Sequence, residues 1–236
     1  MQPVSGRLLL FAIPAKEAKA QARDGKVDKV DTSPFAPTQT SVAAMEVTHL
    51  VPGASVDIDA DAIAFPAGFS HLKAGSYDFQ AVLDVNHDYN YGGRGPGDLV
   101  SDVSEINLGD ASHDGPQLRL TRALAADTPA WTLPERMPAQ MRAAMQPRID
   151  AAKAHASEID FTSPALSAFR GRPVHMRGWV LTPPGYTRDS KAHYPTVYYT
   201  HGYGGNLNEL TFPAASVWAD MASGKMPPMI WVFLDE

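Results

Sequence analysis

Apolar and polar residues alternate in short runs through the first half of the chain, with no helical period of useful length between residues 6 and 122. The clearest alternation lies within 77–85, which predicts a strand with one face against a core. Further strands are predicted at 7–13, 43–50, 55–58 and 103–108, with a weaker one at 117–121. Turn residues such as Pro52-Gly53 separate these runs. Five or six short strands with this spacing predict a β-sandwich domain over residues 1–128.

The middle of the chain changes to a helical pattern. From Pro134 to His155, apolar side chains recur at about every fourth position among Arg and Gln residues that favour helix, at Met137, Met141, Met145, Ile149 and Ala152. Pro138 and Pro147 interrupt this pattern, and a proline in a helix interior costs about 3 kcal/mol. We therefore expect two short helices or a helical linker over residues 129–160, and not one continuous helix.

The last part of the chain has the pattern of strand, helix and strand. Strands are predicted at 174–181, 196–200 and 229–234, and a helix is predicted at 208–223, closed by Gly224. The last two strands are apolar at consecutive positions, which is typical of a parallel sheet covered on both faces. The sequence therefore predicts an α/β unit over residues 161–236.

A glycine-rich loop follows the predicted strand at 196–200. Glycine occupies three of the four positions from Gly202 to Gly205, so the backbone can turn sharply and leave amide N–H groups free. Such amides can stabilise a developing oxyanion, because open α/β sheets bind ligands at the carboxyl ends of their strands. The same pattern also fits a tight strand-to-helix turn, so the residues alone leave both interpretations open.

Composition and charge narrow the classes of function. The chain carries 20 Lys and Arg against 26 Asp and Glu, a net charge of −6, with no basic cluster, so we expect no nucleic-acid partner. The absence of cysteine excludes disulfides, thiolate metal sites and a cysteine nucleophile. The apolar run at 8–14 is too short to cross a bilayer, so we expect no membrane partner. It is also a poor signal peptide, so localisation stays open: cytoplasmic, or periplasmic or secreted with an export signal missing from the start.

Three segments near the end of the chain carry a family resemblance. The stretch Gly178–Tyr186, the pair Tyr194-Pro195 and the loop His201–Asn206 resemble the opening of the catalytic domain in the α/β-hydrolase family that contains esterase D, feruloyl esterases and enterochelin esterases. Residues 41–108 resemble the β-rich amino-terminal domain of the enterochelin-esterase-like members. The resemblance implies a serine esterase that hydrolyses small-molecule carboxylic esters by acyl transfer, and no cofactor is expected.

The resemblance also implies roles for individual loop residues. The backbone N–H of Tyr203, with Gly204 as the adjacent alternative, would supply one half of an oxyanion hole. His201 matches the histidine at the head of the family's loop. It would shape that loop with Gly202 and Gly205, and it is not the base of the catalytic triad.

The chain departs from the family in one large respect. The nucleophile elbow, written G-x-S-x-G, occurs nowhere in the 236 residues, so no catalytic triad residue is assigned. In the family the nucleophile, acid and base follow the strand that matches 229–234, so we expect an amino-terminal fragment with an incomplete parallel sheet. We expect Ile230, Val232 and Phe233 to be exposed on that sheet and to promote self-association.

The segment Asp84–Asn90 has oxygen ligands at alternating positions, as a calcium loop does. Tyr89 stands where a calcium loop needs glycine, and Gly95 stands where it needs glutamate. The pattern therefore favours a polar turn, and we assign no metal.

The alternative function is a non-catalytic binding module. Tyr89, Tyr91 and Arg94 can line a ligand surface, and exposed Tyr89, Tyr91 and Trp131 can supply stacking faces. In this interpretation the amino-terminal sandwich binds a carbohydrate, a siderophore or another domain.

Overall fold

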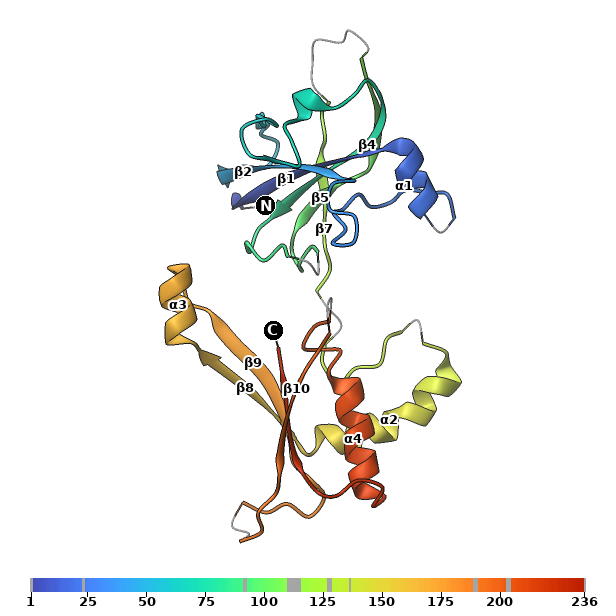
Figure 1. Ribbon diagram of the computed structural model, residues 1–236, viewed down its shortest axis with the longest axis vertical. Helices are drawn as coiled ribbons and strands as arrows, with labels where there is room; N and C mark the ends of the chain where they lie inside the picture. Colours follow the sequence, from blue (N-terminus) through green and yellow to red (C-terminus); the bar gives the residue numbers. More distant parts are fainter. Residues whose placement is uncertain are drawn as a thin grey trace. The chain divides into compact units, whose positions relative to one another are not determined.

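The computed structural model describes residues 2–22, 24–90, 93–109, 116–126, 129–135, 137–188, 191–202 and 205–235. The chain forms two compact units, Met1–Asp127 and Thr128–Glu236 (Figure 1). Most strand pairs in both units are antiparallel, and a few helices accompany each sheet. The chain is therefore β-rich, as the pattern predicts.

The described part of the first unit contains seven strands in one hydrogen-bonded sheet, ordered β3-β2-β1-β4-β5-β7, with β6 paired to the other end of β4. The strands are β1 (Val4–Pro14), β2 (Ser41–Leu50), β3 (Ala64–Phe65), β4 (Gly75–Asp84), β5 (Leu99–Ser101), β6 (Ser104–Leu108) and β7 (Leu120–Ala123). Two short helices accompany them, α1 (Ala15–Gln21) and the 3₁₀ turn η1 (Phe69–His71). All pairs in this sheet are antiparallel.

The central strands β1 and β4 are buried on both faces. Leu8 to Ile13 are apolar at consecutive positions, so β1 contributes to a core on each side of the sheet. On β4, every residue from Tyr77 to Asp84 is buried, so the prediction of a single dry face is wrong. The buried polar side chain of Gln80 is satisfied because its Nε2 donates to the carbonyl of Ser101 at 2.8 Å and its Oε1 accepts from the Val30 N–H at 2.9 Å.

Several details of this unit differ from the predicted pattern. The segment 55–58 is not a strand, although Ile58 still packs against the core. The helix α1 lies where no helical period was recognised, and its seven residues bury Ala15 and Ala18. The strands join one sheet in the described residues, and the two separate stacked sheets of the predicted sandwich are not seen there.

The described residues of the second unit form a four-stranded sheet, ordered β10-β11-β9-β8. Its elements in chain order are α2 (Ala139–Lys153), β8 (Ala156–Thr162), α3 (Pro164–Arg170), β9 (His175–Leu181), β10 (Thr196–Thr200), α4 (Thr211–Ala222) and β11 (Ile230–Leu234). Only the β10–β11 pair is parallel, while β9 runs antiparallel to β8 and to β11. The sequence therefore predicted the parallel pair but did not predict β8 or the antiparallel direction of β9.

The strand β11 lies inside this sheet. Phe233 is fully buried, Val232 is buried and Ile230 is half-buried, so the expectation that these side chains are exposed is wrong. The reason is that β9 and β10 flank β11, while Ile149 of α2 and Ala214 of α4 share a core cluster with Phe233. In Figure 1, α2 and α4 lie together on one side of this sheet.

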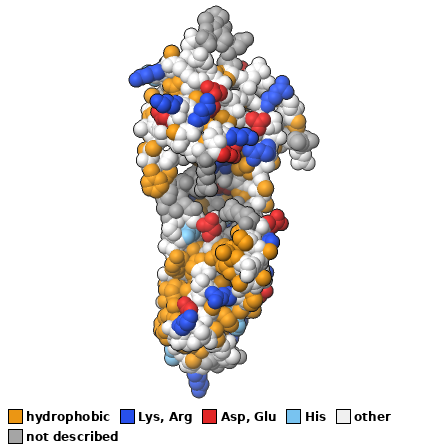
Figure 2. All heavy atoms as spheres, turned by 90° about the vertical axis from the view of Figure 1, so that its right-hand side faces the viewer, with side chains coloured by type: hydrophobic (Ala, Val, Ile, Leu, Met, Phe, Trp, Pro, Cys, Tyr) orange, Lys and Arg blue, Asp and Glu red, His pale blue; other side chains and the backbone are white. Residues whose placement is uncertain are grey.

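The predicted break in the middle of the chain does not occur. Pro138 precedes the first helical residue, and α2 continues through Pro147 to Lys153 as one helix. Proline removes one intrahelical hydrogen bond, but Ile149 and Ala152, which follow it, are buried in the core of the second unit. The helix therefore belongs to this unit, and it is not a linker. Figure 2 views this unit from the side on which α2 and α4 lie in Figure 1, and it shows many hydrophobic side chains there.

Candidate functional site

The end of the β10–β11 ladder brings together two residues that are far apart in the sequence. The parallel register pairs Thr200 with Leu234, so His201 and Asp235 leave their strands side by side at the carboxyl edge. The His201 side chain is buried, with Nε2 3.4 Å from Asp235 Oδ1. Its Nδ1 lies 3.0 Å from the carbonyl oxygen of Gly202. The head of the glycine loop is thus held between two neighbouring parallel strands.

The described part of the loop folds against the ring of His201. The Gly205 N–H donates to the carbonyl of Gly202 at 3.0 Å, which closes a tight turn. A Cβ at position 205 would lie 2.8 Å from the Cβ of His201, so only glycine fits there without movement. Position 202 is different, because a Cβ there would meet no atom of the described residues within 4 Å.

Asn206 connects the loop to the following helical segment. Its Oδ1 accepts from the N–H groups of Asn208 and Glu209 at 3.0 and 3.1 Å. Leu207 and Leu210 are buried in the core beyond it, which anchors the chain before α4 begins at Thr211. The sequence therefore forms a strand, a glycine loop and a helix at one edge of the sheet.

The two residues proposed as oxyanion donors, Tyr203 and Gly204, lie outside the described residues. Their role stays a prediction. His201, Gly202 and Gly205, which were predicted to shape the loop, are in mutual contact.

The predicted ligand surface of the first unit is occupied by internal contacts. The hydroxyl of Tyr89 bonds to Asp31 and to Thr32, and its ring packs 5.7 Å from that of Phe11, centroid to centroid. Burial is the main cause that raises the pKa of the Tyr89 hydroxyl, so the phenol stays neutral. Tyr89 is therefore half-buried and bonded, and the expectation of an exposed stacking face is wrong.

Arg94 is also turned inward. Its guanidinium donates to the carbonyl of Val30 and lies 5.6 Å from the centroid of the Phe11 ring, and its side chain is 5% exposed. Burial lowers the pKa of Arg94, and the charge of Asp31 opposes that shift. The remaining residue of this predicted surface, Tyr91, lies outside the described residues.

Trp131, the third predicted stacking residue, belongs to the core of the second unit. It is 6% exposed and packs edge-on against Trp179 at 5.4 Å. It therefore presents no free face, and the prediction that it is exposed is wrong.

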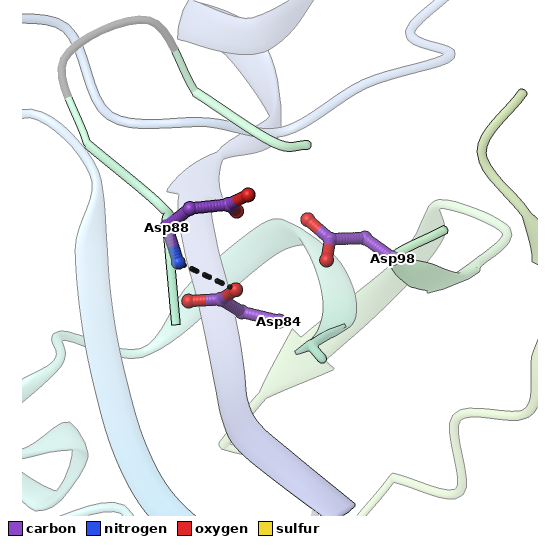
Figure 3. A group of neighbouring side chains, drawn as sticks. All are labelled: Asp84, Asp88 and Asp98. Atoms are coloured by element: carbon purple, nitrogen blue, oxygen red, sulfur yellow. Dashed lines mark hydrogen bonds between the residues drawn. The ribbon is translucent and has the colours of Figure 1, made fainter. Parts of the chain in front are cut away.

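A cluster of three carboxylates lies at the end of β4. Asp84, Asp88 and Asp98 each place an oxygen within 4.8 Å of the others (Figure 3). Asp84 and Asp98 are buried, and Asp88 is exposed. The sequence pattern identified Asp84 and Asp88 but missed Asp98, because pairing of β4 with β5 is needed to bring it close.

The buried oxygens of this cluster already accept backbone hydrogen bonds. Asp84 accepts from the N–H groups of Asp88 and Tyr89 at 3.1 and 3.2 Å. Asp98 accepts from those of Val85 and Gly95 at 3.1 and 2.8 Å. These bonds fix the loop that follows β4, which is the polar turn that the sequence favours.

The electrostatics of the cluster are those of crowded like charges. Desolvation, followed by repulsion from Asp84 and Asp98, raises the pKa of Asp88 above its ordinary value. Burial raises the pKa of Asp98, and its bonds from Gly95 and Val85 oppose the shift. Carboxylate oxygens are ligands that Ca²⁺ prefers. The hydrogen bonds of Asp84 and Asp98 to the loop backbone account for their burial, so we assign no metal to the cluster.

No protein-family model matches the chain, and no curated protein matches it at a significant level. Among the described residues, no helix has both the length and the apolar character needed to span a bilayer.

Proposed function

We propose that the second unit is the opening part of an α/β-hydrolase catalytic domain of the serine esterase type, and that the loop after β10 supplies one oxyanion donor. The observation that carries this proposal is the sequence of strand β10, glycine loop, helix α4 and strand β11, with the two strands parallel and the loop at their carboxyl edge. Ligands bind at that edge in open α/β sheets.

The position of the loop in the chain gives further support. In α/β-hydrolases, one oxyanion N–H comes from the loop between the third strand and the helix that follows it. Here β8, β9 and β10 are the first three strands of the second unit in chain order, and α4 follows β10. The sheet order is β8-β9-β11-β10, so the loop after β10 lies at the end of a parallel pair beside an antiparallel β9.

The proposed chemistry is acyl transfer from a small-molecule carboxylic ester. A serine oxygen attacks the ester carbonyl, and the negative charge that develops on the carbonyl oxygen is stabilised by the N–H of Tyr203, with Gly204 as the adjacent donor. One such donor contributes about 10²–10³-fold to kcat. Because G-x-S-x-G is absent from the 236 residues, the chain by itself holds the oxyanion side of this machinery and no nucleophile elbow.

The direct test is anion binding at the loop, followed by the amide signals in ¹⁵N NMR spectra of the full chain. We expect acetate and butyrate to cause saturable shifts at Tyr203 or Gly204, and chloride at equal ionic strength to leave them unchanged. Tyr203→Pro removes the N–H and should abolish binding, whereas Tyr203→Phe keeps the N–H and should retain it. Absence of carboxylate-specific shifts would overturn the proposal.

A second test measures turnover. We expect no hydrolysis of a short-chain nitrophenyl ester above the rate given by a heat-unfolded sample. Hydrolysis that a serine-directed fluorophosphonate blocks would mean that the active site lies elsewhere in the chain.

A further inference from the structure

We propose that Asp235 is a positioning residue for the glycine loop and that it acts through His201. The inference deepens the proposed function, because it concerns the same loop and takes its catalytic meaning from the oxyanion role. Its geometric part does not depend on that role. Asp235 was not singled out in the sequence, since thirty or so residues of chain separate it from the loop and only the parallel register brings it there.

The His201 ring lies between the glycine loop and the end of β11. Nδ1 faces the carbonyl oxygen of Gly202 at 3.0 Å, and a carbonyl can only accept a hydrogen bond. Nε2 faces the carboxylate of Asp235 at 3.4 Å, which accepts when it is ionised. The geometry points to a ring held between a carbonyl of the loop and a carboxylate at the end of the neighbouring strand.

Asp235 is itself held in place by the sheet. Its backbone N–H donates to the carbonyl of Arg177 at 3.0 Å, which extends the antiparallel pairing of β11 with β9 by one residue. The guanidinium of Arg177 interacts electrostatically with this carboxylate. Its pKa is raised chiefly by a hydrogen bond to Glu158, with a smaller contribution from the charge of Asp235. The pairing of β11 with β9 thus fixes the backbone from which the carboxylate projects.

The ring of His201 transmits this position to the loop. Gly205 packs so closely that an added Cβ would lie 3.0 Å from both Cγ and Nδ1 of the ring, and its N–H closes the turn onto Gly202. A rotation of the ring would therefore disturb the turn that carries residues 203 and 204. The direction of their N–H groups is the property that an oxyanion donor needs.

The test uses NMR of the full chain with Asp235→Asn and Asp235→Glu. We expect the ring signals of His201 to shift in Asp235→Asn, because the carboxylate beside Nε2 is replaced by a neutral amide. We expect the amide hydrogen of Gly205, which bonds to the carbonyl of Gly202, to exchange about tenfold faster in that variant, because the ring that supports this turn loses its charged neighbour. Asp235→Glu keeps the carboxylate and should leave both measurements closer to those of the unmodified protein. Glu209→Gln, which removes an equal charge from an exposed side chain of the same unit, should change neither measurement.

Two results would overturn the inference. One is a set of His201 ring signals that is the same in the unmodified protein and in Asp235→Asn, and the other is a Gly205 exchange rate in Asp235→Asn that matches that of Glu209→Gln. Unchanged indole signals of Trp179 and Trp231 would establish that the variant is folded. Carboxylate binding at the loop of the unmodified protein separates the two proposals. If the loop signals shift in Asp235→Asn but no carboxylate binds, the positioning role stands and the esterase role is overturned. If carboxylate binds but the loop signals do not shift in Asp235→Asn, the positioning role is overturned and the esterase role stands.

Discussion

β4 in the first unit and β10 in the second lead into the two candidate sites, yet they are buried to opposite degrees. Eight consecutive residues of β4 are buried, whereas four of the five residues of β10 are exposed. β4 pairs with β1, β5 and β6, and β10 pairs within the described residues with β11 alone. A polar side chain at a strand end can therefore be fixed in two ways. Asp84 is buried, and the backbone N–H groups of the following loop hold its carboxylate. His201 follows a mostly exposed strand, and its buried ring is held by contact with Asp235.

The largest expected effect tests whether β11 forms the core of the second unit. Phe233→Ala removes a fully buried ring, and we expect it to destabilise this unit by about 3–5 kcal/mol. Urea unfolding followed by tryptophan fluorescence reports on this unit, because all four tryptophans lie within it. Phe169→Ala is the matched control, since that ring is 86% exposed and its loss should change stability by less than about 0.5 kcal/mol. Equal effects of the two variants would contradict the placement of β11.

The next effect concerns the close approach of the loop to His201. Gly205→Ala puts a methyl group 2.8 Å from the His201 Cβ, and we expect a loss of about 1–3 kcal/mol together with shifted amide signals in the loop. Gly202→Ala adds the same methyl group where no atom of the described chain lies within 4 Å, and it should be tolerated. Urea unfolding and amide spectra of both variants check the difference. If Gly202→Ala were the more damaging change, the loop would not be folded around the ring.

A smaller effect is expected at the carboxylate cluster of the first unit. The pKa of Asp88 in the folded chain is raised above its ordinary value of 3.8. The ionised carboxylate of Asp88 therefore destabilises the folded state. This effect is absent below pH 3.8 and grows as the pH rises through the raised pKa. Asp88→Asn should therefore stabilise the first unit at neutral pH by a few tenths to about 1 kcal/mol, and by less under acid conditions. Amide hydrogen exchange in β4 at both pH values measures this, with exposed Asp57→Asn as the control. A gain that is the same at both pH values would show that charge repulsion is not its cause.

The smallest expected change in folding stability is at the exposed edge of the second sheet. Tyr198 is 71% exposed on β10, a strand without charged residues, and such edges pair with other chains. We expect the chain to self-associate through β10, and not through β11 as the sequence alone indicates. Tyr198→Lys should lower the weight-average mass in sedimentation experiments while changing stability by less than about 0.5 kcal/mol. Tyr186→Lys, on an exposed turn of the same unit, should leave the mass unchanged.

The sequence predicted the elements whose signal is local. β10 was predicted with its observed bounds, because five uncharged residues of high β-propensity lie between a proline and a glycine loop. Elements without such a signal were missed. β8 alternates charged residues with apolar ones and is mostly exposed, and β5 has only three residues. The continuous helix α2 was missed because the local cost of Pro147 was weighed without the packing of Ile149 against α4.

The candidate sites depended more on register than on composition. His201 was recognised from the loop pattern, but its contact with Asp235 follows from the pairing of Thr200 with Leu234. Asp98 likewise joins Asp84 only because β4 and β5 are neighbours. A sequence pattern describes residues along one segment, and it does not specify which residues two segments bring into contact.

One ladder in the second unit couples assembly of the site to folding of its core. Phe233 points into the core, and Asp235 follows it by two positions, directly after the end of β11. A slip of β11 by one residue would turn Phe233 out toward the opposite face and carry the carboxylate away from His201 in the same step. A misaligned sheet would therefore lose the packing of Phe233 and the contact of Asp235 with His201 together. A shift in the register of β11 cannot separate Asp235 from the loop and still leave the second unit well packed.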